Sequence, residues 1–210
     1  MKKQFYLLAT GLFTVCIVNA QIKKGDILLG GNLNFSKQDT KPMSSNSTSI
    51  TVAPSFGIAT KDNQVIGFNL SYGHTKAENY SYPTQTSDIY GAGVFLRRYK
   101  LLGSGFSLFA EGNFMGYYSH QKNIYYTGTG VPTDTKGYSF YLGFYPGIAY
   151  AISRHVQLET GFQNLAYASY GHTKTTITGA TNDVKTDNFL LGTALNNNLG
   201  GFTVGLKWLL

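Results

Sequence analysis

Residues 137–152 read GYSFYLGFYPGIAYAI, and large apolar or aromatic side chains occupy nearly every second position of this stretch. Small or polar residues, among them Ser139, Gly143 and Gly147, stand between them. Because successive side chains of a β-strand point to opposite faces, this period of two predicts a strand with one apolar face. The stretch is longer than the ~9–11 residues that a tilted strand needs to cross a bilayer.

Seven further segments alternate in the same way. They cover residues 27–36, 50–58, 66–72, 90–97, 105–118, 156–163 and 202–210. No apolar run of ~18 residues follows Gln21, so a transmembrane helix is not predicted. A ninth strand could begin at Phe189, but bacterial single-chain barrels have even strand numbers. We therefore merge it with the last segment as one strand interrupted around residues 196–201, which predicts eight strands, with ten as the alternative.

The connections between these segments alternate in length. Those near residues 60–64, 100–104 and 153–155 are short, and four long polar connections separate them. The long ones are residues 37–48, 75–87, 119–136 and 171–186. Tight turns on one side and long loops on the other are typical of outer-membrane barrels. The sequence therefore predicts an all-β fold, a transmembrane antiparallel up-and-down β-barrel, with long extracellular loops that could contact an extracellular ligand.

The composition agrees with a lipid-facing surface. Charged residues make up 13% of the 210 residues and aromatic residues 15%. Soluble proteins expose roughly 25–35% charged residues at their surface, and disordered chains have few aromatic residues. The formal net charge is +7, but the cations are scattered. This excess favours the phosphates of outer-membrane lipids or lipopolysaccharide as partners, and we expect no nucleic acid partner.

Residues 1–20 have the layout of a secretory signal peptide, with Lys2 and Lys3 ahead of an apolar core. Cleavage is expected after Ala20, which leaves residues 21–210 as a single barrel domain. Cys16, the only cysteine, would be removed with the signal. The mature chain is therefore expected to have no disulfide and no thiol ligand for a metal.

The chain resembles the small outer-membrane β-barrel family that is abundant in Bacteroidetes. The resemblance covers residues 21–210 and rests on the signal ending at Ala20, the alternating strands and the terminal strand. That strand carries the pattern of a barrel assembly signal, formed by Thr203, Gly205, Trp208 and Leu210. Leu210 departs from the pattern, which most often ends in Phe. The resemblance implies the outer membrane of a Gram-negative bacterium and insertion by its assembly machinery, but no activity.

Four charged residues take the inward position of their strands: Arg97, Glu111, Glu159 and Lys207. All four are expected near the periplasmic side of an interior that side chains can fill. Buried charges are costly unless they are paired, so we predict a neutralising cluster that closes the lumen. A catalytic pair of Glu111 and Glu159 is the alternative.

One hexapeptide, Ser-Tyr-Gly-His-Thr-Lys, occurs twice, at residues 71–76 and 169–174. Both copies end a strand at the expected extracellular rim, where His120 ends a third strand. The rim residues singled out are Tyr72, His74, His120, Tyr170 and His172. We interpret them as anchors and head-group contacts at the membrane interface. A metal site and a Ser–His lipid hydrolase are alternatives, but no carboxylate stands beside these histidines at ligand spacing in the sequence.

The sequence thus favours a monomeric barrel with a side-chain-filled lumen and a structural or surface-interaction role. A narrow passive transport barrel for small or hydrophobic solutes is the first alternative. An outer-membrane lipid-modifying enzyme is the second, although no catalytic residues, cofactor or metal ligands are predicted.

Overall fold

A computed structural model of the chain describes residues 21–40, 45–79, 84–124, 131–162, 164–193 and 202–210. The predicted signal peptide, residues 1–20, lies outside these residues. The described part contains ten strand segments, all paired antiparallel. They are β1 (Ile27–Thr40), β2 (Ser45–Lys61), β3 (Gln64–Asn79), β4 (Thr84–Gly103), β5 (Phe106–Ile124), β6 (Thr133–Ala151), β7 (Val156–Phe162), β8 (Ala166–Ile177), β9 (Val184–Thr193) and β10 (Phe202–Leu209).

The ten segments occupy eight positions around the barrel. β6 pairs with β7 along residues 147–151 and with β8 along residues 133–144, so β7 and β8 form one interrupted strand. β10 pairs with β7 and β9 pairs with β8, so β9 and β10 form another. The eight-strand prediction is therefore confirmed and the ten-strand alternative is wrong. The predicted interruption at residues 196–201 lies outside the described residues.

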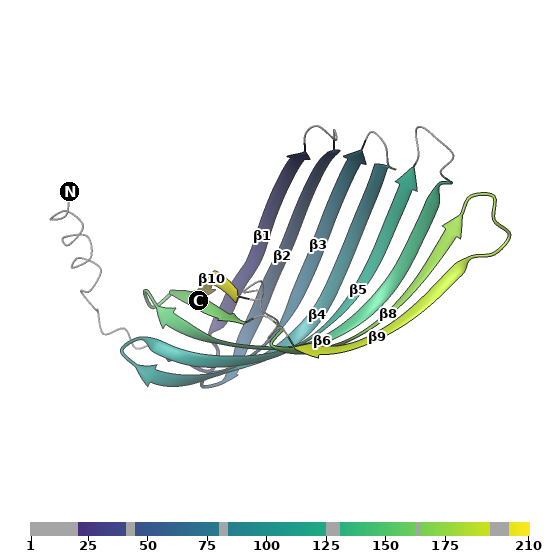
Figure 1. The fold of residues 1–210 in the computed structure, drawn as a ribbon. Helices are drawn as coiled ribbons and strands as arrows, with labels where there is room; N and C mark the ends of the chain where they lie inside the picture. Colours follow the sequence, from purple (N-terminus) through teal and green to yellow (C-terminus); the bar gives the residue numbers. More distant parts are fainter. Residues whose placement is uncertain (1–20, 41–44, 80–83, 125–130, 163, 194–201) are drawn as a thin grey trace, which may run out of the picture.

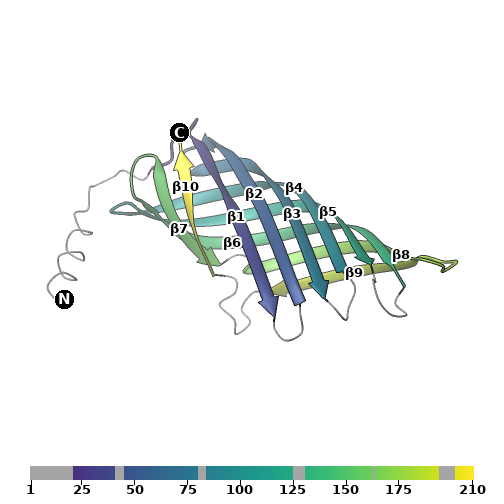
Figure 2. The same cartoon turned by 90° about the horizontal axis from the view of Figure 1, so that it is seen from above.

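The ring of pairings closes through β1 and β10. Leu28 is opposite Leu209 and Leu29 is opposite Trp208 in this pair. Ile27 and Leu210 also exchange two backbone hydrogen bonds of 2.8 and 2.9 Å. The closure lies at the end of the barrel that holds both chain ends of the domain and the three short connections, which we call the turn end. Figure 2 shows β7 and β10 beside β1 near the C-terminus, and Figure 1 shows the longer strands spreading into a curved sheet towards the other end, which we call the hairpin end.

The four long connections are mostly strand rather than open loop, which corrects the prediction. β3 continues to Asn79 and β4 begins at Thr84, so most of residues 75–87 belongs to a paired hairpin. The other three long connections are shortened in the same way. Continued pairing satisfies the backbone hydrogen-bonding groups, and polar side chains bond across it. The hydroxyl oxygens of Thr135 and Thr175, for example, lie 2.9 Å apart.

The lumen near the turn end is filled by large side chains that lie over glycines. A Cβ built on Gly57 would lie 2.9 Å from the ring of Phe95. At Gly147 a Cβ would meet the ring of Phe109 at a similarly prohibitive distance. The buried apolar side chains at this end include Val65, Phe95, Tyr99, Phe109 and Ala149. Most apolar side chains on the strand faces that point away from the lumen are exposed, so the barrel has an apolar outer surface. No helix among the described residues is long and apolar enough to span a membrane.

Candidate functional site: a charged cluster across the lumen

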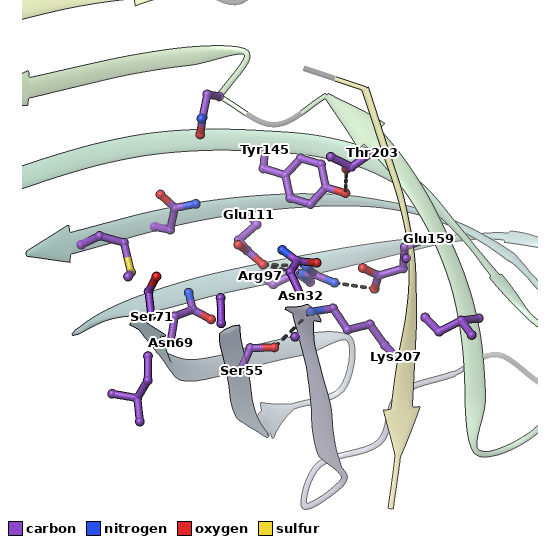
Figure 3. A pocket seen from close by; sticks show the side chains of 18 of the residues that line it. Asn32, Ser55, Asn69, Ser71, Arg97, Glu111, Tyr145, Glu159, Thr203 and Lys207 are labelled. Atoms are coloured by element: carbon purple, nitrogen blue, oxygen red, sulfur yellow. Dashed lines mark hydrogen bonds and ion pairs between the residues drawn. The ribbon is translucent and has the colours of Figure 1, made fainter. Parts of the chain in front are cut away.

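Three of the four inward charged residues meet at the turn end of the lumen. Arg97 on β4 is directly opposite Glu111 on β5, and its Nε donates to Glu111 Oε2 over 2.7 Å. The same guanidinium donates through Nη1 to Glu159 Oε1 on β7. Because β4 and β7 are three positions apart in the ring, Arg97 reaches across the lumen, as Figure 3 shows. Arg97 is only 2% exposed, so this ion network is buried.

Aromatic side chains complete the surroundings of the guanidinium. Arg97 Nη1 donates to the Tyr99 hydroxyl over 3.0 Å, and that hydroxyl donates to Glu159 over 3.3 Å. The Phe109 ring centroid lies 4.4 Å from the guanidinium carbon, within the range of a cation–π contact. Tyr99 and Phe109 were not among the residues predicted for this cluster. Both could have been found from the alternation of the strands, because Tyr99 points to the same strand face as Arg97, and Phe109 to the same face as Glu111.

Lys207, the fourth of the predicted charges, is not bonded directly to Arg97, Glu111 or Glu159. Its Nζ donates to Ser55 Oγ over 3.1 Å, and no ion pair of Lys207 is present among the described residues. The fork of the Arg97 guanidinium matches carboxylates better than a point-like ammonium does, and it binds both glutamates. One guanidinium and two carboxylates leave the network one negative charge in excess, which the positive charge of Lys207 on β10 offsets.

A polar cavity of about 250 Å³ lies directly on the hairpin side of the cluster. Arg97, Glu111 and Glu159 are among its lining residues. Other lining residues from five strands carry amide or hydroxyl groups: Asn32, Ser55, Asn69, Ser71, Asn113, Tyr117 and Thr203. Figure 3 shows the labelled members of this set converging from several strands. The cluster thus forms the floor of the cavity.

The two glutamates bind one guanidinium, which is the arrangement of an ion network. An acid–base pair needs one carboxylate with a raised and one with a lowered pKa, each facing a substrate. Here the nearest charged partner of both carboxylates is Arg97. The contacts therefore account for both glutamates without a catalytic role.

The rim histidines each contact an aspartate, so the expectation that no carboxylate lies beside them is wrong. His74 Nδ1 lies 2.8 Å from Asp88 Oδ1, and His172 Nδ1 lies 2.8 Å from Asp187 Oδ1. Each aspartate stands directly opposite its histidine on the next strand, 14 or 15 residues along the chain. Spacing in the sequence therefore hid a contact that strand register creates.

The repeated hexapeptide builds the same three-residue arrangement twice. The Tyr72 hydroxyl donates to Asp88 over 3.4 Å, and the Tyr170 hydroxyl donates to Asp187 over 2.8 Å. His120 makes a third pair, with its Nε2 3.0 Å from Asp134 Oδ1. No group of three or more potential metal ligands occurs among the residues that the structure describes.

A triad of serine, histidine and aspartate does not form at these sites. Ser71 and Ser169 precede the tyrosines of the two repeats, so they take the opposite face of their strands from His74 and His172. Ser71 lines the lumen cavity. Ser71 and Ser169 therefore do not form a Ser–His pair with the histidines of their own repeats.

These pairs predict a stability that depends on pH. The hydrogen bond from His74 holds the pKa of Asp88 below its ordinary value, and His172 does the same for Asp187. A carboxyl group whose pKa is lowered by folding stabilises the folded state at pH values above its pKa in the unfolded chain, about 3.9. This contribution is lost as the pH falls through the lowered pKa of the folded state. We expect the variant carrying Asp88→Asn and Asp187→Asn to lose less stability than wild type as pH falls below about 4.

The measurement is the urea midpoint of detergent-folded protein as a function of pH. Asp39→Asn is the matched control, because Asp39 is an exposed aspartate on β1 whose ion pair is with Lys37 rather than with a histidine. Parallel pH profiles for wild type and the double variant would contradict the prediction.

Four tyrosines form a continuous row across neighbouring strands near the rim. Tyr72, Tyr90, Tyr118 and Tyr138 stand opposite one another on β3, β4, β5 and β6. The Tyr138 ring stacks on the ring of His172 on β8, at 5.2 Å between centroids. The sequence placed each tyrosine on the apolar strand face, and only the register reveals that they are aligned.

The terminal residues close the barrel. Trp208 stands opposite Leu29, and the Leu210 backbone bonds to Ile27. The Thr203 hydroxyl lies inside, 3.0 Å from the Tyr145 hydroxyl. A Cβ on Gly205 would meet no atom within 4 Å, so packing in the folded barrel does not require glycine there. The assembly role of these residues stays a prediction.

No protein-family model and no curated protein matches the chain. Among solved structures, it is similar to the translocator domain of the autotransporter NalP from Neisseria meningitidis, with 11% identity and a TM-score of 0.49, covering 99% of this chain and 67% of that one. It is also similar to the outer membrane protein OprG from Pseudomonas aeruginosa, with 14% identity and a TM-score of 0.44, covering 90% and 97%. Neisserial surface protein A shares 13% identity with a TM-score of 0.38, covering 90% and 97%. At these identities no residue role is transferred to the chain.

Proposed function

We propose that the chain is an outer-membrane barrel whose lumen is closed at the periplasmic end and whose role is structural or in surface interactions. The observation that carries the proposal is the network of Arg97, Glu111 and Glu159, which crosses the lumen from β4 to β7. Tyr99 and Phe109 pack around the same guanidinium. Together these side chains occupy the space through which a solute would have to pass.

The outer surface supports a position in a membrane. Apolar side chains face outward along the middle of the strands, and the row of Tyr72, Tyr90, Tyr118 and Tyr138 marks their boundary towards the hairpin end. Beyond this row the outward positions become charged, beginning with His74 and Asp88. An apolar band bordered by aromatic residues is typical of outer-membrane barrels. The hairpin end would then be extracellular and would contact lipopolysaccharide or other surface ligands.

Conductance across a planar bilayer tests the closure. We expect purified wild-type barrel to insert without producing a stable, large conductance. Arg97→Gly removes the guanidinium that bridges the lumen and should give frequent or larger channel openings. Arg98→Gly is the matched control, because Arg98 is the adjacent, exposed arginine of β4 and should leave the traces unchanged. A stable large conductance of wild type would sink the proposal and favour the narrow transport barrel.

Two further measurements address the location and the lipid-modifying alternative. The protein should fractionate with the outer membrane, and its intact mass should correspond to residues 21–210. Mass analysis of lipid A with and without the protein tests for an enzyme. We expect identical lipid A spectra, and a new species that depends on the protein would contradict the structural role.

A further inference from the structure

An apolar hollow lies on the outer face of the barrel wall, towards the turn end. Its volume is about 500 Å³, and its lining comes from β4, β5, β6 and β7. Ala110 and Pro146 are short outward residues that stand directly opposite each other in the middle of this lining. Leu108, Ile148 and Phe162 are its larger apolar side chains. The hollow is therefore distinct from the polar cavity, which lies inside the lumen.

The hollow lies where β6 changes its partner strand. β6 pairs with β8 up to Phe144 and with β7 from Gly147 onward. Pro146 stands between these two pairings, where its missing N–H leaves no donor without a partner. A Cβ on Gly112, the next outward residue of β5 after Ala110, would meet no atom within 4 Å. Short residues thus continue the hollow along β5, towards the middle of the apolar outer surface.

Two cations border the hollow on its β4 side. Arg98 is paired with Ala110 and Lys100 with Leu108, and both cations are exposed outward residues. Neither forms an ion pair among the residues that the structure describes. No aspartate or glutamate belongs to the described lining of the hollow. This edge therefore carries two positive charges that no carboxylate of the lining offsets.

The positive excess of the described chain is concentrated at the same end of the barrel. The four charges inside the lumen balance one another. The described part of the hairpin end also balances, with six lysines from Lys37 to Lys185 and six acidic residues from Asp39 to Asp187. The turn end has two acidic residues, Asp26 and Asp62, and six basic ones: Lys23, Lys24, Lys61, Arg98, Lys100 and Arg154. This distribution favours an anionic partner at the turn end.

We propose that the hollow binds one acyl chain of an anionic glycerophospholipid from the periplasmic leaflet, whose phosphate is held by Arg98 and Lys100. The inference rests on the proposed membrane position, in which the turn end lies at this leaflet. The guanidinium fork matches two phosphate oxygens, and the Lys100 ammonium adds a second positive charge. The acyl chain lies against Leu108, Ile148 and Phe162. The volume of the hollow falls within the ~300–1,000 Å³ that is usual for ligand sites.

A second copy of this chain fits the hollow less well than a lipid does. In a two-fold interface the same patch of both copies meets itself. Two copies would therefore bring two Arg98 and two Lys100 side chains together, and like charges placed against each other oppose association. A phospholipid complements the same patch in both of its parts, the apolar hollow and the cationic edge.

Native mass spectrometry of the barrel folded in a neutral maltoside detergent tests the site. The probes are dioleoyl phosphatidylglycerol, which is anionic, and dioleoyl phosphatidylcholine, which has the same acyl chains and a zwitterionic head group. We expect one phosphatidylglycerol molecule to bind to each barrel, with saturation and with a higher affinity than phosphatidylcholine.

Substitution of the two cations tests the phosphate contact. The variant with Arg98→Met and Lys100→Met should bind phosphatidylglycerol about tenfold more weakly or worse, because it loses charge-assisted hydrogen bonds. Lys23→Met with Arg154→Met is the matched control. It also removes two exposed cations of the turn end, but neither lines the hollow, so it should bind like wild type. Arg98 and Lys100 lie on the outer face, so their substitution should change lipid binding and leave the lumen closed.

Filling the hollow tests the acyl-chain contact separately from the charges. Ala110→Leu keeps both cations and places a larger side chain in the middle of the lining, so it should weaken the binding of phosphatidylglycerol. Ala92→Leu is its control, because Ala92 is an exposed outward residue of β4 that does not line the hollow. The gel shift between folded and unfolded barrel establishes that each variant is folded.

Four results would overturn the proposal. The first is equal or unsaturable binding of the two lipids. The second is equal weakening by the two double variants, which would indicate a general attraction to the turn end. The third is displacement of the lipid by an equal concentration of glycerol phosphate, which would identify a site for a free anion. The fourth is a dimer that Ala110→Leu dissociates, which would assign the hollow to a second copy.

The closed-lumen proposal and the lipid site are tested by different measurements. Lipid binding in detergent involves neither conductance nor fractionation with the outer membrane. Failure of the lipid site and failure of the proposed function are therefore distinguishable.

Discussion

Replacing Arg97 by methionine is expected to lower the free energy of unfolding by about 3–5 kcal/mol, because it leaves two buried carboxylates without their partner. Glu111 and Glu159 both bind the Arg97 guanidinium, and both are buried. The lost Tyr99 and Phe109 contacts add to the effect. The measurement is the urea midpoint of protein folded in detergent or liposomes, followed by the gel shift between folded and unfolded barrel.

Two variants separate the buried network from a general effect of charge. Arg98→Met removes an exposed cation from the next position of β4 and should change the unfolding free energy by less than about 0.5 kcal/mol. The triple variant with Arg97→Met, Glu111→Gln and Glu159→Gln removes both the cation and the uncompensated charges. It should recover a large part of the loss, because replacing a complete ion network by neutral groups costs less than breaking it. Equal destabilisation by Arg97→Met and Arg98→Met would contradict the assignment of the network.

Phe109→Ala is expected to produce the second large loss, about 3–5 kcal/mol, through the cavity left by the missing ring. Phe109 is 3% exposed and lies between three groups that hold the floor of the cavity together. Its ring packs edge-on against Tyr145 at 5.1 Å, contacts Tyr99 at 6.0 Å and faces the Arg97 guanidinium. The strands on either side are held in register, so they cannot collapse into the vacated space. The urea midpoint again provides the measurement.

Phe114→Ala is the matched control for Phe109→Ala. Phe114 lies on the same strand but faces outward and is 47% exposed. In a detergent micelle, which adapts to the shortened side chain, its loss should be clearly smaller. Similar losses for the two variants would show that the lumen packing contributes no more than the outer surface. Phe109→Ala and Arg97→Met should be less than additive in combination, because the two side chains contact each other.

The strand pattern and the inward parity of the charged residues could be predicted because both depend on neighbouring residues in the chain. Arg97 and Glu111 flank a short turn, so their proximity follows from a hairpin whose register the turn fixes. The length of the hairpins was underestimated, since polar strand residues beyond the membrane resemble loop residues in composition. Thr135 and Thr175 are such residues, and they pair across β6 and β8.

The contacts that define the candidate sites depended on strand order and register. His74 and Asp88 are ordinary rim residues in the sequence, and they become partners only because β3 and β4 align them. The choice of Glu159 rather than Lys207 as the third member of the cluster has a similar origin. It depends on the distance across the lumen and on the guanidinium geometry, neither of which a pattern of alternation records.

The sequence by itself determined an eight-stranded barrel with an apolar outer face and a charged interior, because a period of two assigns every side chain to one of two faces. Only the tertiary structure decided that Arg97 binds Glu111 and Glu159 across the lumen, that Lys207 donates to Ser55, and that β1 pairs with β10 at Leu28 and Leu29. The contacts of Arg97 with Glu159 and of Lys207 with Ser55 join residues 62 and 152 positions apart, and the pairing of β1 with β10 joins the two ends of the barrel domain. Local alternation assigns each side chain to a face but does not record which strands pair or at which register, so these contacts leave no trace in the pattern.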